Sequence, residues 1–172
     1  MKDASNTQPV DIKTEIERLH AHCRCAILAT TDSLGRAQAS YAPYAFMDGC
    51  YYIFISELAP HTSNIQLNPS VGILIIEDET SARNIYARSR LNYHTHATII
   101  ERDSAECRAA LAVLREHAGN TIDALAQLGG FIMVRLTPQK GLLVLGFGKA
   151  YELDHRDPSN PVHIDQTYLK NR

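Results

Sequence analysis

Residues 37–56 read AQASYAPYAFMDGCYYIFIS and carry the clearest β-hairpin signal in the chain. Two runs rich in Tyr, Phe, Ile and Ala flank Asp48-Gly49, a dipeptide that favours the tight turn between two antiparallel strands. Pro43 lies inside the first run and indicates an edge position or a bulge, because proline has no backbone N–H to donate. The stretch therefore predicts antiparallel pairing and argues against a parallel sheet built from alternating strands and helices.

Further strands are predicted on both sides of this hairpin. Residues 25–32 (CAILATTD) predict a buried strand, and the almost wholly apolar residues 71–78 (VGILIIED) predict a strand that is buried on both faces. Alternation over 90–99 predicts one buried face, made of Leu91, Tyr93, Thr95, Ala97 and Ile99. Residues 131–138 and 141–153 predict two more strands, joined by a turn at Pro138–Gly141.

Four helices are predicted from capping residues and apolar spacing. Asp11 begins a helix that runs to about Cys23, and Pro60 begins a short one that ends before Asn68-Pro69. Residues 104–119 and 121–128 predict two more. Six or seven strands in hairpins with few helices predict an α+β fold, an antiparallel barrel with helices packed outside. We expect a disordered tail over 1–10, one domain over 11–155 and a C-terminal arm over 156–172.

Composition excludes several classes of protein. The chain has 172 residues, 45% of them hydrophobic, which is sufficient for one domain with its own core. A formal charge of −2 argues against a nucleic-acid binder, and we expect no membrane span because no apolar run approaches about 20 residues. The N-terminus is polar and has no export signal, so we expect a cytoplasmic protein whose four cysteines are free thiols.

The segment from Ser56 to Asn64 is the most informative for chemistry. A strand ends at Ser56 and a helix begins near His61, Thr62 and Ser63, so hydroxyls and free N–H groups gather where a helix dipole favours an anion. Helix capping alone would also explain these residues.

Three other groups are weaker candidates. Arg88 and Arg90, two residues apart on a predicted strand, would share a face and could hold an anion, or could be solvated. Glycines around Phe147 indicate a bulge in a strand, with close approach of a flat ligand as the alternative. The His and Cys residues between 20 and 25 lack the spacing of a metal site.

Together, the runs SYAPY, ELAPHTSNIQLNP, ARSRL and GFGKAY resemble the FMN-binding split-barrel superfamily, which includes pyridoxamine 5′-phosphate oxidase. The nearer resemblance is to its branch of bacterial haem-iron utilisation proteins, and it covers roughly residues 15–155. The resemblance implies an antiparallel split β-barrel that forms a homodimer, with haem or FMN bound between the two subunits. It implies cofactor contacts from the following residues: Ser56, His61, Thr62, Ser63, Asn64, Arg88, Arg90, Lys149 and Tyr168.

The sequence departs from the haem-degrading members at two positions. Those members resemble one another in a C-terminal histidine that ligates iron and in an aspartate, before the Phe of the sixth strand, that orients it. Here Gly130 precedes Phe131 and Tyr168 stands near the histidine's place, so Tyr168 or His163 is the candidate iron ligand. Three functions follow: a haem-binding dimer with or without oxidative haem degradation, an FMN-dependent oxidoreductase, and a non-catalytic ligand-binding dimer.

Overall fold

An antiparallel β-barrel forms the centre of the computed structural model, which describes residues 11–154 and 157–164. Six of the described strands close the barrel in the order β3-β2-β1-β4-β5-β6, and β6 returns to pair with β3. The expected α+β split barrel is thereby confirmed. Its strands are β1 (Cys25–Thr31), β2 (Ala37–Met47), β3 (Cys50–Ser56), β4 (Ser70–Ile76), β5 (Arg90–Ile100) and β6 (Phe131–Val144).

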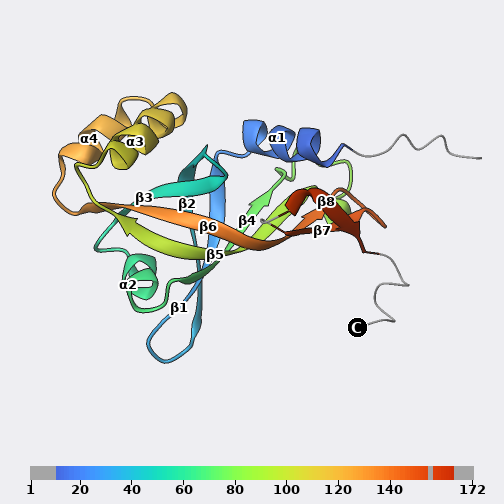
Figure 1. The fold of residues 1–172 in the computed structure, drawn as a ribbon, viewed down its shortest axis with the longest axis horizontal. Helices are drawn as coiled ribbons and strands as arrows, with labels where there is room; N and C mark the ends of the chain where they lie inside the picture. Colours follow the sequence, from blue (N-terminus) through green and yellow to red (C-terminus); the bar gives the residue numbers. More distant parts are fainter. Residues whose placement is uncertain (1–10, 155–156, 165–172) are drawn as a thin grey trace, which may run out of the picture.

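Two further strands continue the sheet beyond β6. β7 (Ala150–Asp154) pairs with the end of β6, and β8 (Asp157–His163) pairs with β7, so part of the expected C-terminal arm is a strand. Figure 1 shows this pair extending at the side of the barrel away from α2. The expected disordered tail over 1–10 and Tyr168 lie outside the described residues.

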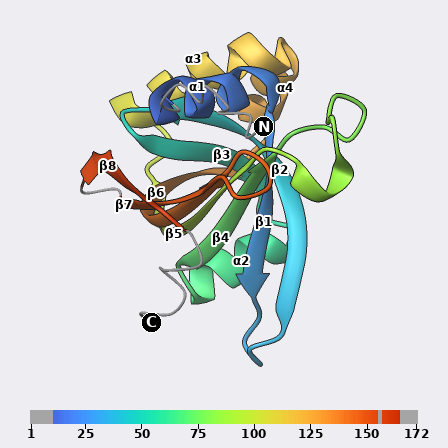
Figure 2. The same ribbon diagram turned by 90° about the vertical axis from the view of Figure 1, so that its right-hand side faces the viewer.

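The helices pack against the outside of the barrel. α1, α3 and α4 lie on one side and α2 lies on the other (Figures 1 and 2). Within the described ranges, no helix is long and apolar enough to cross a membrane. The helices are α1 (Ile12–His22), α2 (Pro60–Leu67), a 3-10 turn (Ile85–Ala87), α3 (Ala105–Ala118) and α4 (Thr121–Gln127).

The β2–β3 hairpin forms as predicted. Asp48 and Gly49 both have positive φ, 52° and 74°, as a tight hairpin turn requires. Pro43 lies where β2 changes its partner, because β2 pairs with β1 up to Pro43 and with β3 from Tyr44 onward. The missing N–H therefore falls at the junction between two ladders.

The turn predicted at Pro138–Gly141 is wrong. β6 runs through these residues as one strand of 14 residues, and β5 pairs with it on both sides of a register shift between Tyr93 and Thr95. The glycine is needed for packing, since a Cβ on Gly141 would overlap the ring of Tyr93. The residues that predicted a turn therefore lie at an irregularity in β6, which stays extended because β5 pairs with it on both sides.

Two apolar clusters stabilise the fold, one on each face of the sheet. The first fills the barrel and includes Leu19 of α1 together with Tyr51 and Leu136. The second lies between the barrel and the α3–α4 pair and includes Ile100 and Met133. The predicted burial of Ile99 is wrong, because Ile100 faces the helices and Ile99 is half-exposed.

The outer face of the β2-β1-β4 region is apolar but uncovered in a single chain. Ile27 is 42% exposed, and its cross-strand neighbours on this face are Tyr41, 68% exposed, and the half-buried Leu74. β4, predicted to be buried on both faces, is fully buried on one face and mostly half-buried on the other in one chain. β1, predicted as a buried strand, is buried on one face only. The inward positions of both strands are buried as expected.

We predict that Gly141→Ala destabilises the protein, because the new methyl group must displace the partly buried Tyr93 ring. The expected loss is about 1–3 kcal/mol of unfolding free energy, which urea denaturation would measure. Gly130→Ala is the matched control, since a Cβ there meets open space. Equal stability of the two variants would contradict the proposed overlap.

Candidate functional site

The turn between β3 and α2 is held by the residues first proposed for anion binding. The hydroxyl of Thr62, which is fully buried, donates to the carbonyl of Ser56 at 2.6 Å. The hydroxyl of Ser56 accepts from the N–H of Leu58 at 3.2 Å. Pro60 occupies the first helical position, as predicted. Ser56 and Thr62 therefore stabilise the entry to α2.

Asn64 attaches α2 to the barrel. Its side chain is 6% exposed, and its Nδ2 donates to Thr30 Oγ1 at 3.0 Å and to Gln38 Oε1 at 2.8 Å. Both acceptors lie on β1 and β2, so this amide fixes the helix against two strands. Ser63, one residue earlier, is exposed and open to a ligand.

His61 carries a polar atom of this helix that makes no hydrogen bond within the described fold. Its imidazole Nε2 is shielded from solvent and has no hydrogen-bond partner within the described residues. Burial lowers the pKa of His61, so the ring is neutral at pH 7. A buried nitrogen without a partner costs free energy unless a bound group or a second chain supplies one.

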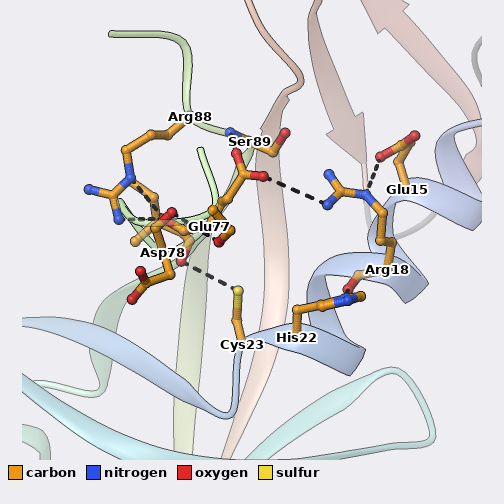
Figure 3. A network of polar contacts seen from close by, with 10 residues as sticks. Glu15, Arg18, His22, Cys23, Glu77, Asp78, Arg88 and Ser89 are labelled. Carbon is orange, nitrogen blue, oxygen red and sulfur yellow. Dashed lines mark hydrogen bonds and ion pairs between the residues drawn. The ribbon is translucent and has the colours of Figure 1, made fainter. Parts of the chain in front are cut away.

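Arg88 and Arg90 do not form the expected pair on one strand. Arg88 precedes β5, and Nε and Nη2 both donate to the carbonyl of Glu77, with Nη1 at 3.0 Å from Glu79. Figure 3 shows Arg88 turned toward the chain at Glu77. Arg90 begins β5 and donates to the carbonyl of Arg88. The expectation for Arg88 fails because a 3-10 turn replaces the start of the strand.

The cluster of His and Cys residues near α1 also serves the fold. His22 Nδ1 lies 2.8 Å from the carbonyl of Arg18, and the thiol of Cys23 donates to the carbonyl of Ile76 (Figure 3). Arg18 joins the same network through Glu15 and Glu77. In the part of the chain that the structure describes, no group of three potential ligands could hold a metal ion.

The glycine-rich segment after β6 is a hairpin loop, which corrects the predicted bulge. Gly146 and Gly148 have φ of 133° and 68°, and the N–H of Lys149 donates to the carbonyl of Gly146. Lys149 is exposed at the end of this loop. Positive φ at both positions explains the pair of glycines.

His163 lies against this hairpin. Its Nε2 is 2.9 Å from the carbonyl of Gly148, and its ring centroid is 5.1 Å from that of Tyr151. The carbonyl can only accept, so Nε2 is the donor, and in the neutral ring Nδ1 is the nitrogen with the lone pair. A histidine whose other nitrogen donates to a carbonyl is the usual form of a metal ligand.

The candidate residues form two groups at opposite ends of β6. At its start, Phe131 pairs with Ser56, which places α2 there. At its end, Val144 pairs with Arg90, and the hairpin with Lys149 and His163 follows. A strand of 14 residues spans roughly 40 Å at about 3.3 Å per residue. One chain therefore does not bring the two groups together.

The fold and this arrangement define a class: an antiparallel split barrel with candidate ligand residues at both ends. The chain belongs to the pyridoxamine 5′-phosphate oxidase family, whose model matches residues 12–145. The expected resemblance to this superfamily and its haem-utilisation branch is confirmed by the relatives described next.

The relatives match over most of this chain. Heme oxygenase HutZ of Vibrio cholerae is 38% identical over 159 residues, which are 92% of this chain and 90% of HutZ. The crystal structure of HutZ, described as a heme storage protein, has a TM-score of 0.74 and 37% identity over 78% of this chain and 96% of that one. Campylobacter jejuni ChuZ has a TM-score of 0.84 and 28% identity over 94% of this chain and 65% of ChuZ.

We predict that Asn64→Ala lowers the unfolding free energy by about 1–3 kcal/mol, because it leaves the buried Thr30 hydroxyl and the half-buried Gln38 amide oxygen without their donor. Ser63→Ala, on the exposed side of the same helix, should change it by less than about 0.5 kcal/mol. Thermal unfolding of both variants measures this. An unaltered Asn64→Ala melting temperature would return Asn64 to the ligand-binding group.

Proposed function

We propose that this protein is a haem-binding split-barrel homodimer that holds haem between its two chains. The relatives support this ligand, since HutZ is named a heme oxygenase and described as a heme storage protein. The observation that carries the proposal is the division of the candidate residues between opposite ends of β6. A ligand that contacts candidate residues from both ends of β6 must therefore lie between two chains.

The outer sheet face supplies the surface for the second copy. A row of side chains crosses this face from Tyr41 through Ile27 and Leu74, with the small Ala39, Ala29 and Gly72 in the next row. Flat apolar surface of this kind is typical of an interface between identical chains. A two-fold axis would place the α2 end of one chain beside the β6–β7 hairpin of its partner.

The residues present fit haem. His163 is exposed, and the Gly148 carbonyl orients its ring so that Nδ1 could bind iron. In this role the carbonyl would take the place of the orienting aspartate, whose position Gly130 occupies here. Arg90 and Lys149 provide cations near the same end for the carboxylates of haem. His61 would approach from the other chain with its unpartnered Nε2. Haem, when bound, would supply an iron centre able to react with oxygen, and we include oxidative haem degradation in the proposal.

FMN is the alternative cofactor because the family contains flavin proteins. A phosphate at the start of α2 would meet fewer open donors than expected. The Thr62 hydroxyl and the Asn64 amide are engaged within the fold, and Arg88 is held by Glu77 and Glu79. These contacts favour haem over FMN.

Haem binding is tested by absorption titration of the purified protein with haemin and, separately, with FMN. We expect a Soret band that saturates at one haem per chain. When ascorbate is added in air, we expect the Soret band to disappear and biliverdin-like absorbance to replace it. His163→Ala should shift the Soret band and weaken haem binding at least tenfold. The matched control is His22→Ala, which also removes an exposed imidazole held by a carbonyl.

Two outcomes would contradict parts of the proposal separately. A saturating Soret band that is identical in His163→Ala and the native protein would exclude His163 as the iron ligand and leave haem binding intact. Retention of FMN with no haem saturation would overturn the haem proposal itself.

The dimer is tested by Ile27→Glu, which places a charge on the outer face. We expect a monomer by light scattering at micromolar concentration, because burying an unpaired carboxylate is costly. Haem affinity should fall at least tenfold in the same variant. Leu128→Glu, at the C-terminal end of α4 and 54% exposed, should remain a dimer. A monomeric native protein would contradict the shared site.

A further inference from the structure

The mouth of the barrel beneath α1 contains a cavity of about 510 Å³ that is separate from the proposed haem residues. Ile12 and Ile16 of α1 form one wall, and Phe46, Tyr51 and Tyr93 of the barrel form the others. We propose that this cavity binds an uncharged aromatic molecule of two or three rings that carries one hydrogen-bonding group. Barrel mouths are frequent sites for small apolar ligands.

Aromatic side chains give the cavity its preference for flat molecules. The ring of His20 lies 4.3 Å from that of Phe46 and 5.5 Å from that of Tyr51, measured between centroids. Tyr51 in turn lies 6.1 Å from Tyr93. The rings already make tilted and edge contacts with one another, so a flat guest extends an existing cluster.

Two of the residues that line this cavity, His20 and Tyr93, each carry a polar atom that could pair with a guest. His20 Nε2 is paired with the Tyr51 hydroxyl at 2.9 Å, so its Nδ1 is the remaining nitrogen. Neither this Nδ1 nor the Tyr93 hydroxyl has a hydrogen-bond partner within residues 11–154 and 157–164, and neither is sealed away. A few polar atoms among apolar and aromatic side chains are the usual means of orienting a small ligand.

The charge of the cavity excludes ionic guests. Burial lowers the pKa of His20 to about 4 and raises the pKa of Tyr93 to about 12, so both are neutral at pH 7. At the rim, Lys13 and Glu17 lie 3.9 Å apart and neutralise each other. An ionised guest would lose its hydration and gain no opposite charge in the interior.

The experiment uses two fluorescent probes of similar aromatic size with the full-length protein. N-phenyl-1-naphthylamine is neutral, and 1-anilinonaphthalene-8-sulfonate adds a sulfonate. We expect the neutral probe to bind at one site per chain with a micromolar Kd, and the sulfonate at least tenfold more weakly. No saturable binding, or tighter binding of the sulfonate, would overturn the proposal.

Variants place the probe in this cavity. Ile16→Trp fills the space from the α1 wall and should weaken the neutral probe at least tenfold. Leu128→Trp, an exposed control at the residue that follows α4, should leave its Kd unchanged. Tyr93→Phe keeps the ring, removes the hydroxyl and should weaken binding two- to tenfold, which preserves the test if Ile16→Trp fails to fold. An identical Kd in all these proteins would overturn the assignment. This inference does not depend on haem binding.

Discussion

The structure depends on β6, which closes the barrel. Its first half pairs with β3, most of its length from Met133 onward pairs with β5, and its last residues pair with β7. The irregularity around residues 139–140 lets one strand serve these partners in turn, because a bulge increases local bending and twist. Everything proposed for the site follows from this strand: α2 is fixed at one end by the pairing of Ser56 with Phe131, and the hairpin that holds His163 is fixed at the other.

The apolar outer face of β2, β1 and β4 offers a way to bring together the two groups of candidate residues that β6 keeps apart. Ile27 and Leu74 belong to strands whose inward residues already fill the barrel, so their exposure is not required by folding of one chain. Covering them with a second copy would bury apolar surface and bring opposite ends of two barrels together in one step. Stability of the dimer and completion of the site would then depend on the same contact.

Local signals predicted most of the elements. Asp48-Gly49 and Pro60 act through their own backbone conformation. The predicted helix over 104–119 is capped at its start by the Ser104 hydroxyl, which accepts from the N–H of Cys107, and at its end by Gly119 with a φ of 61°. Each of these signals acts within a few residues of its own position. Where prediction failed, long-range pairing had overridden a local preference: β5 kept β6 extended through Pro138 and Gly141. The position of Arg88 was missed because its guanidinium folds back on the loop at Glu77, a contact that spacing does not reveal. The apolar outer positions of β1 and β4 were visible in the sequence but did not indicate what covers them.

A sequence motif at a site combines residues that build the scaffold with residues that remain open to a ligand. In the α2 segment, Ser56, Thr62 and Asn64 make hydrogen bonds within the fold, whereas His61 has a buried nitrogen without a partner and Ser63 is exposed. Such a set lacks the concentration of charged donors that a phosphate favours. A large flat ligand that is held mainly by apolar contact, one histidine and a few cations would need fewer such donors from this end of the barrel. Haem as the ligand is therefore favoured by which residues of the motif are already bonded within the fold and which are not, more than by the presence of the motif.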